Sequence, residues 1–152
     1  MRRFLLALPI LVLATGVVAQ DHQAFESSDA IKWQPAPPFL PKGAEIAILS
    51  GDPMASSGSF AIRIKTPAGY KFPPHSHSQT EQVTIISGDF GFGMGERFDE
   101  SKGQELKPGG FANMPAKMSH FAWTKNGTVF QIQGQSPFDI IYVNPADDPQ
   151  KQ

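Results

Sequence analysis

The sequence predicts an all-β domain with an extended N-terminal arm, and three of its features lead to that expectation. Glycine and proline each account for 14 of the 152 residues, whereas only 18% of the residues are charged. This composition favours short strands joined by tight turns. Runs of β-branched and aromatic residues recur between turn residues, which is typical of a sandwich or barrel. No segment shows a sustained helical period of apolar residues.

Length, charge and cysteine content narrow the classes of protein further. A chain of 152 residues is long enough to bury one core and short for two ordinary domains. Its 13 Lys and Arg residues are matched by 14 Asp and Glu residues, so there is no cationic surplus for binding nucleic acid. The absence of cysteine excludes disulfides, thiolate catalysis and metal sites built on cysteine.

The first 19 residues have the pattern of a secretory signal peptide. A basic start, Met1-Arg2-Arg3, precedes an apolar run of 11 residues at 4–14. Val17 and Ala19 suit the −3 and −1 sites of a signal peptidase. A membrane anchor is the weaker alternative, because a spanning helix needs about 20 apolar residues. We expect residues 1–19 to be removed, which leaves a periplasmic or secreted protein without membrane contact.

Residues 20–43 are expected to form an extended, proline-rich arm. The segment Trp33-Gln34-Pro35-Ala36-Pro37-Pro38-Phe39-Leu40-Pro41 contains too many prolines for a helix interior. Its large apolar groups would be unusual on a mobile linker. We therefore expect the arm to lay Trp33, Phe39 and Leu40 on the domain surface. The β domain is expected over residues 44–144, with a C-terminal tail at 145–152.

Eight strands are predicted within this domain from β-rich runs bounded by turn residues. They are residues 45–49, 59–65, 81–87, 90–94, 111–114, 119–124, 128–133 and 138–143. Asn126-Gly127 indicates a type I′ hairpin, in which both turn positions need positive φ. Gln131 and Gln133 share one face of their strand. Whether that face meets solvent or enters the barrel as a ligand contact stays open.

Three of the four histidines call for a common explanation. His75 and His77 are two residues apart, so on a strand both side chains point to one face. Glu81 lies four residues further along and shares that face if the strand continues. His120, in the run 119–124, would bring a third imidazole across a barrel. Imidazole and carboxylate ligands suit Fe, Mn, Ni, Cu or Zn. His22 lies beside the expected cleavage site and is expected to have no role.

At these residues the sequence resembles the cupin superfamily. The first cupin motif is matched at each fixed position. Gly69 is followed by five residues, His75, Ser76 and His77, then three residues and Glu81, then six residues and Gly88. The motifs and their flanking strands extend the resemblance over about residues 44–143.

The second cupin motif is matched in part. Gly109, Pro115 and His120 stand at its fixed positions, so its metal-binding histidine is present. Lys117 stands where the family usually has glycine, and Thr124 stands where it usually has asparagine.

The resemblance implies a fold and a metal site. The fold would be a small cupin-type jelly-roll β-barrel, also called a double-stranded β-helix. His75, His77, Glu81 and His120 would be the ligands of a divalent transition metal, with open positions for water or substrate. A metal-free structural role for these four residues is the weaker interpretation, because no family ligand is missing.

Alternation along the strands predicts the surroundings of this site. Val83 and Ile85 share the inward parity of Glu81 and would give the metal an apolar environment. If His120 faces inward, Phe121 and Trp123 face outward and need cover. That cover would come from the arm or from a second copy of the chain, and we favour a homodimer.

Two classes of function follow. The chain would be a metal-dependent enzyme acting on a small organic molecule, as a dioxygenase, isomerase, decarboxylase or lyase, with dioxygenase-like chemistry favoured. Alternatively, it would be an exported module that binds or senses a metal or small ligand without turnover, since fold alone does not decide between the two. No phosphate-binding loop or nucleophile elbow appears, so other chemistry has no support.

Overall fold

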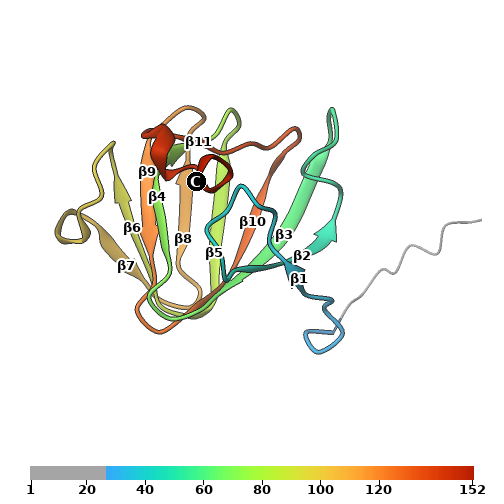
Figure 1. The fold of residues 1–152 in the computed structure, drawn as a ribbon. Helices are drawn as coiled ribbons and strands as arrows, with labels where there is room; N and C mark the ends of the chain where they lie inside the picture. Colours follow the sequence, from blue (N-terminus) through green and yellow to red (C-terminus); the bar gives the residue numbers. More distant parts are fainter. Residues whose placement is uncertain (1–26) are drawn as a thin grey trace, which may run out of the picture.

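The computed structural model describes residues 27–152, so the expected signal peptide, His22 and the first part of the arm lie outside the described residues. The described chain forms two antiparallel sheets that face each other (Figure 1). The strands are β1 (Gln34–Pro35), β2 (Glu45–Ser50), β3 (Ser59–Thr66), β4 (Lys71–Ser76), β5 (Glu81–Gly88), β6 (Phe90–Met94), β7 (Gln104–Leu106), β8 (Phe111–Met114), β9 (His120–Trp123), β10 (Thr128–Gln135) and β11 (Ile141–Tyr142). Three short 3₁₀ helices are η1 (Glu100–Lys102), η2 (Pro145–Asp147) and η3 (Pro149–Lys151).

Strands close in sequence repeatedly change sheets. One sheet has the order β1-β2-β3-β10-β5-β8 and the other β11-β4-β9-β6-β7. The steps from β3 to β4, β4 to β5 and β5 to β6 each cross from one sheet to the other. This connectivity confirms the predicted all-β jelly roll. None of the helices in the described part of the chain is long and apolar enough to cross a membrane.

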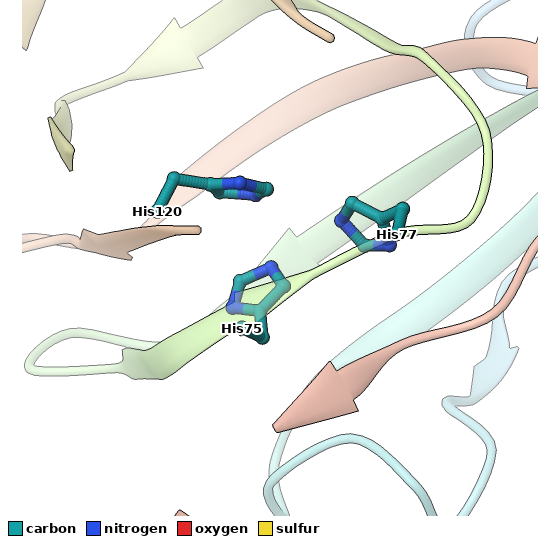
Figure 2. A group of neighbouring side chains, drawn as sticks. All are labelled: His75, His77 and His120. Atoms are coloured by element: carbon teal, nitrogen blue, oxygen red, sulfur yellow. The ribbon is translucent and has the colours of Figure 1, made fainter. Parts of the chain in front are cut away.

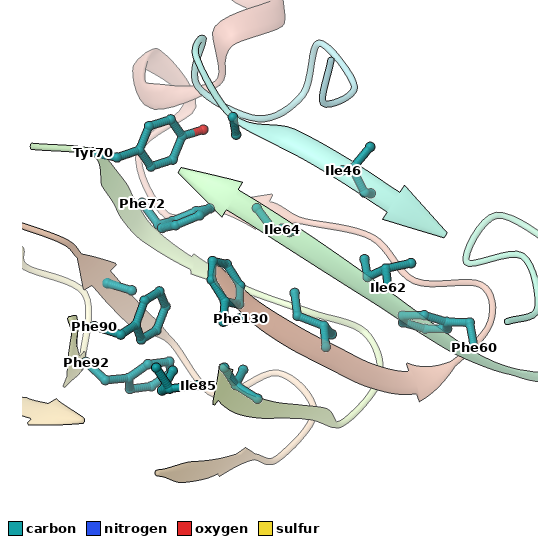
Figure 3. Close-up of a cluster of buried hydrophobic side chains, with 14 residues drawn as sticks. Ile46, Phe60, Ile62, Ile64, Tyr70, Phe72, Ile85, Phe90, Phe92 and Phe130 are labelled. Atoms are coloured by element: carbon teal, nitrogen blue, oxygen red, sulfur yellow. The ribbon is translucent and has the colours of Figure 1, made fainter. Parts of the chain in front are cut away.

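The core lies between the two sheets, where their inward side chains meet (Figure 3). Along β3, buried and partly exposed residues alternate, so Phe60, Ile62 and Ile64 point inward. Val83 and Ile85 of β5 are each 1% exposed, which confirms their predicted inward parity. Burial of one such side chain contributes roughly 1.5–3 kcal/mol. These contacts hold the sheets at the spacing that the site between them requires.

The eight predicted strands are all observed, within a few residues at their ends, but β1, β4 and β7 are not among the predictions. β4 contains Pro73-Pro74, which cannot donate to a sheet ladder. The structure accommodates the pair where the β4–β9 register shifts between Phe72 and His75. The expected strand at 138–143 shortens to β11. Gln131 and Gln133 lie on the outer face of β10, because both are more exposed than the residues that alternate with them. They do not enter the barrel.

The type I′ turn predicted at Asn126-Gly127 is wrong. Gly127 has φ +90, but Lys117 is the only non-glycine residue of the described chain with positive φ. The segment also joins β9 to β10, which belong to different sheets, so it is not a tight hairpin. Asp89 holds it instead, by accepting hydrogen bonds from Thr124 Oγ1, the Lys125 amide and Asn126.

Phe121 and Trp123 are buried by other side chains of the same barrel. The two rings are only 0% and 4% exposed. The Phe98 ring centre lies 5.0 Å from that of Phe121 and 6.2 Å from that of Trp123. Gly91 gives Trp123 room, since a Cβ there would lie 2.0 Å from the indole. The expected cover by the arm or by a second copy is therefore wrong, and the homodimer stays a prediction without this support.

The described part of the arm lies along the edge of the six-stranded sheet and then lines a cavity of the barrel. β1 pairs with β2, with Gln34 opposite Ile46. Trp33 is half-buried, with Lys65 Nζ 4.9 Å from its ring centre. A turn at Pro37 to Leu40, closed by the Leu40 amide and the Pro37 carbonyl at 3.0 Å, brings Phe39 and Leu40 to the wall of a cavity.

Candidate metal centre

His75 and His120 lie opposite each other on neighbouring strands. They are register partners in the β4–β9 ladder, and both are buried, with 5% and 1% exposed. The proline pair before His75 keeps this stretch extended while the register shifts. The ring centres of the two histidines are 4.3 Å apart. Sheet pairing thus brings together two imidazoles from segments far apart in sequence.

His77 and Glu81 complete the group from the two sides of the barrel. β4 ends at Ser76, so His77 lies just past its end, and Glu81 is the first residue of β5 in the other sheet. The strand does not continue from His77 to Glu81. The short connection turns back instead and brings the carboxylate to the imidazoles. Glu81 Oε2 lies 3.6 Å from His77 Nε2 and 3.4 Å from His120 Nε2.

In each of the three histidines, Nδ1 is hydrogen-bonded to a backbone carbonyl. The acceptors are the carbonyls of Pro73 for His75 at 2.6 Å, Asp139 for His77 at 2.5 Å and Met118 for His120 at 3.0 Å. A carbonyl oxygen only accepts, so Nδ1 carries the hydrogen and a neutral ring keeps its lone pair on Nε2. One ligand atom from each ring lies within 4.8 Å of the others (Figure 2). This is the arrangement in which metal-binding histidines are held.

Aromatic side chains fix the planes of two of these rings. Phe138 stacks on His77 with ring centres 4.5 Å apart and 18° between planes. Phe92 stacks on His120 at 5.2 Å and 14°. Because one face of each imidazole is packed and its Nδ1 is bound, rotation away from the centre would lose several contacts at once.

Burial and neighbouring charges shift the pKa values within the group. Burial, together with His120 and His77, lowers the pKa of His75 to about 3, so this ring is neutral near pH 7. Burial alone would raise the pKa of Glu81, but His120 and His77 hold it below its usual range, and Glu81 is ionised. Burial also opposes the charged form of His77, yet Glu81 outweighs it and raises the pKa of that ring.

The residues present fit a transition-metal ion. His77 Nε2 and His120 Nε2 are buried and have no hydrogen-bond partner among the described residues, and an unsatisfied buried group costs about 1–3 kcal/mol. A space of about 20 Å³ beside His75, Glu81 and His120, with otherwise apolar walls, has room for one water-sized particle. The nitrogen and carboxylate donors of the group match Fe, Mn, Ni, Cu or Zn. One cation held by the group would satisfy both unpaired nitrogens and offset the charge of Glu81.

An apolar cavity leads to this group. It has a volume of about 150 Å³ and is lined on one side by His75, His77 and Glu81. Most of its other walls are aliphatic or aromatic, among them Ile62, Ile64, Phe72, Ile132 and Phe138. An apolar wall lowers the local dielectric and strengthens the interaction of the site with charge or dipoles. The arrangement can therefore bind a metal and present a small molecule to it away from bulk water.

The chain belongs to the cupin superfamily. The family described as the ChrR cupin-like domain matches residues 21–137, which is most of the chain. No curated protein matches the sequence.

Three solved structures share the fold at low sequence identity. The polyketide cyclase RemF from Streptomyces resistomycificus is 17% identical, with a TM-score of 0.67 over 84% of this chain and 89% of that one. A provisionally assigned acetylacetone dioxygenase from Methylibium petroleiphilum PM1 is 19% identical, with a TM-score of 0.61 over 86% and 88%. An RmlC-like cupin from Shewanella frigidimarina NCIMB 400 is 14% identical, with a TM-score of 0.58 over 74% and 90%.

The structure brings together all four residues that the sequence singled out: His75, His77, Glu81 and His120. Sequence reasoning missed the residues that hold them, above all Phe138 and Asp139. These two lie about sixty positions after His77, and no local spacing connects them to it. Only the pairing of β11 with β4 brings that segment to the site.

Proposed function

We propose that this protein is an exported, metal-dependent cupin enzyme that acts on a small organic molecule. One observation carries the proposal: the unpaired Nε2 atoms of His77 and His120 converge with Glu81 at the inner end of an apolar cavity. His75, His77, Glu81 and His120 are the proposed ligands of one Fe, Mn, Ni, Cu or Zn ion. The basic, apolar and small-residue pattern of residues 1–19 supports export to the periplasm or the medium.

The ion would act as a Lewis acid toward substrate oxygens, or, if redox-active, allow reaction with dioxygen. The chain supplies binding, orientation and exclusion of water. Its buried histidines hold fixed tautomers, Glu81 contributes negative charge, and the aliphatic walls keep water from the reacting groups. Dioxygenase-like chemistry is the favoured reaction. The similarity in fold to a provisionally assigned acetylacetone dioxygenase is compatible with it, as the similarity to a polyketide cyclase is with a lyase or isomerase.

The test is metal analysis of protein isolated from the compartment to which its own host delivers it. We expect about one transition-metal ion per chain, and oxygen uptake or substrate loss when small oxygen-bearing organic compounds are screened. His120→Ala, prepared in the same way, should lack both the metal and the activity. Absence of bound metal after reconstitution with each of the five ions would rule the proposal out.

A second candidate is a module that binds or senses a small ligand at the metal without turnover. It is favoured by the absence, in the described chain, of a separate acid–base pair in the cavity. Apart from His75, His77 and Glu81, its ionisable lining residues are Asp52 and Asp139, both exposed at the rim. Ligand binding to the metal-loaded protein with no product in any assay would favour this role over catalysis.

A further inference from the structure

Part of the cavity wall comes from the arm. Phe39 and Leu40 of the arm line it together with Gln34 and Pro37. Opposite them lie barrel residues such as Ile64, which Figure 3 shows pointing inward from β3. Leu40 is partly buried and packs against the hydrophobic core. The arm therefore closes a space that the two sheets alone would leave open.

Two tyrosine hydroxyls hold the arm in this position. Tyr142 donates to the Phe39 carbonyl at 2.8 Å, and Tyr70 donates to the carbonyl of Pro41. Tyr142 is also the register partner of His75 in the β11–β4 ladder. The arm is thus tied to the strand that carries a proposed metal ligand, and its distance from the site is fixed by hydrogen bonds on both sides of Leu40.

The charges around the cavity favour an uncharged occupant. Neither Lys nor Arg is among its lining residues in the described chain. Its acidic lining residues are Glu81, Asp52 and Asp139. Away from the proposed metal, an anionic group would therefore meet carboxylates and no cationic side chain. A cation would lose its hydration against aliphatic walls, which is costly without full pairing.

The volume limits the size of the occupant. An apolar protein cavity of about 150 Å³ holds one benzene molecule, and this cavity has about the same volume, 150 Å³. Two fused rings would not fit without movement of a wall. Within the arm, Leu40 lies between the two carbonyls that the tyrosines bind and packs against the core, so its side chain is a fixed part of the wall and limits the space.

We propose that the ligand of this site has an uncharged, apolar body of about one six-membered ring, and that Leu40 sets its upper size. The inference rests on the proposed function only in taking the cavity as the place where the substrate binds. Leu40 acts here as a specificity-determining residue.

The experiment measures binding of benzene, naphthalene and benzoate to the full-length exported protein, by calorimetry and thermal shift. Metal-free protein is used, so that benzoate has no metal to bind. Wild type should bind benzene, bind naphthalene at least about tenfold more weakly, and fail to bind benzoate. Leu40→Ala should tighten naphthalene binding by about tenfold, the range in which pocket size discriminates ligands. Leu106→Ala is the matched control, because Leu106 also packs partly buried against the core but lies outside the cavity lining.

The proposal is overturned if benzoate binds as well as benzene, if benzene does not bind, or if the two leucine variants change naphthalene binding equally. Should Leu40→Ala fail to fold, Leu40→Trp provides the second test. Filling the cavity should abolish benzene binding while the protein, before its metal is removed, keeps the metal content of wild type. Retained benzene binding would overturn the proposal. Metal analysis of each preparation before its metal is removed separates the two hypotheses. Full metal content without benzene binding rejects this inference alone, whereas benzene binding without any metal rejects the proposed enzyme alone.

Discussion

The backbone amide of Lys117 donates a hydrogen bond of 2.7 Å to the carbonyl of His77. Lys117 adopts φ +65 to make this contact, and it is the only non-glycine residue of the described chain with positive φ. The position is the one where the cupin pattern usually has glycine. A side chain in this region of φ costs about 1 kcal/mol, so the chain retains strain next to a proposed metal ligand.

Lys117→Gly should stabilise the protein. Glycine adopts positive φ without a Cβ penalty, and its extra freedom in the unfolded chain offsets only part of the gain, so we expect about 0.5–1 kcal/mol in the free energy of unfolding. Urea denaturation of the metal-free protein measures it. Ala116→Gly is the control, since Ala116 is equally exposed and lacks positive φ. It should lower stability, and a gain of similar size there would contradict the explanation.

The sequence predicted that His75, His77, Glu81 and His120 lie close together, and the spacing of the first three is a local property. His75, His77 and Glu81 lie within one short segment, and their grouping needs only the correct barrel around them. What could not be predicted depends on contacts between distant segments. Trp123 can be buried because Gly91, on a neighbouring strand, leaves room for its indole ring. The carbonyl that orients His77 belongs to Asp139. Neither leaves a periodic or spaced signal in the sequence.

His120→Ala should abolish metal binding and leave a folded barrel. The variant removes one of the two unpaired buried nitrogens but none of the aliphatic core contacts between the sheets. We expect loss of stoichiometric metal, and a change of about 1–3 kcal/mol in the unfolding free energy of the metal-free protein. Metal analysis and circular dichroism measure the two effects. His22→Ala should bind metal like wild type. A His120→Ala protein with full metal content would show that the proposed site is wrong.

Asp139→Ala should weaken metal binding although Asp139 is not a proposed ligand. Its carboxylate accepts hydrogen bonds from the Ser78 amide at 2.7 Å and the Ser78 hydroxyl at 2.6 Å, while its carbonyl accepts from His77 Nδ1. Loss of such an outer contact typically lowers metal affinity by about 10–100-fold. Competition with a chelator of known affinity measures the change.

The matched control for Asp139 is Asp52→Ala. Asp52 is an exposed acid that also lines the cavity rim, but its side chain binds the Met54 amide and no histidine. It should leave metal affinity within about twofold of wild type, as expected for a rim charge. Asp139→Asn should restore part of the affinity, because an amide oxygen still accepts from Ser78. Equal losses in the two alanine variants would mean that rim charge, rather than the orientation of His77, is responsible.

Asp89→Asn tests how the chain forms its turn at the end of β9, where Thr124 replaces the usual asparagine. Asp89 accepts hydrogen bonds of 3.0 Å from Thr124 Oγ1, 2.6 Å from the Lys125 amide and 2.8 Å from Asn126 Nδ2. Partial burial opposes ionisation, but these donors outweigh it and hold the pKa of Asp89 below its ordinary value. We expect the variant to lose about 1–2 kcal/mol of stability at pH 7.

The loss in Asp89→Asn should depend on pH in a defined direction. The folded pKa is depressed, so the stabilisation is fully present above the ordinary carboxyl value of about 4 and is lost as pH falls through the folded value. Wild type and variant should therefore differ most near neutral pH and converge in acid. Urea melts at pH 7, 5 and 3 measure the difference. Glu96→Gln, which removes an exposed acid outside these hydrogen bonds, reports the effect of net charge alone. A wild-type advantage over Asp89→Asn that stays constant down to the lowest pH would show that the shape of the side chain, and not its ionised carboxylate, holds the turn.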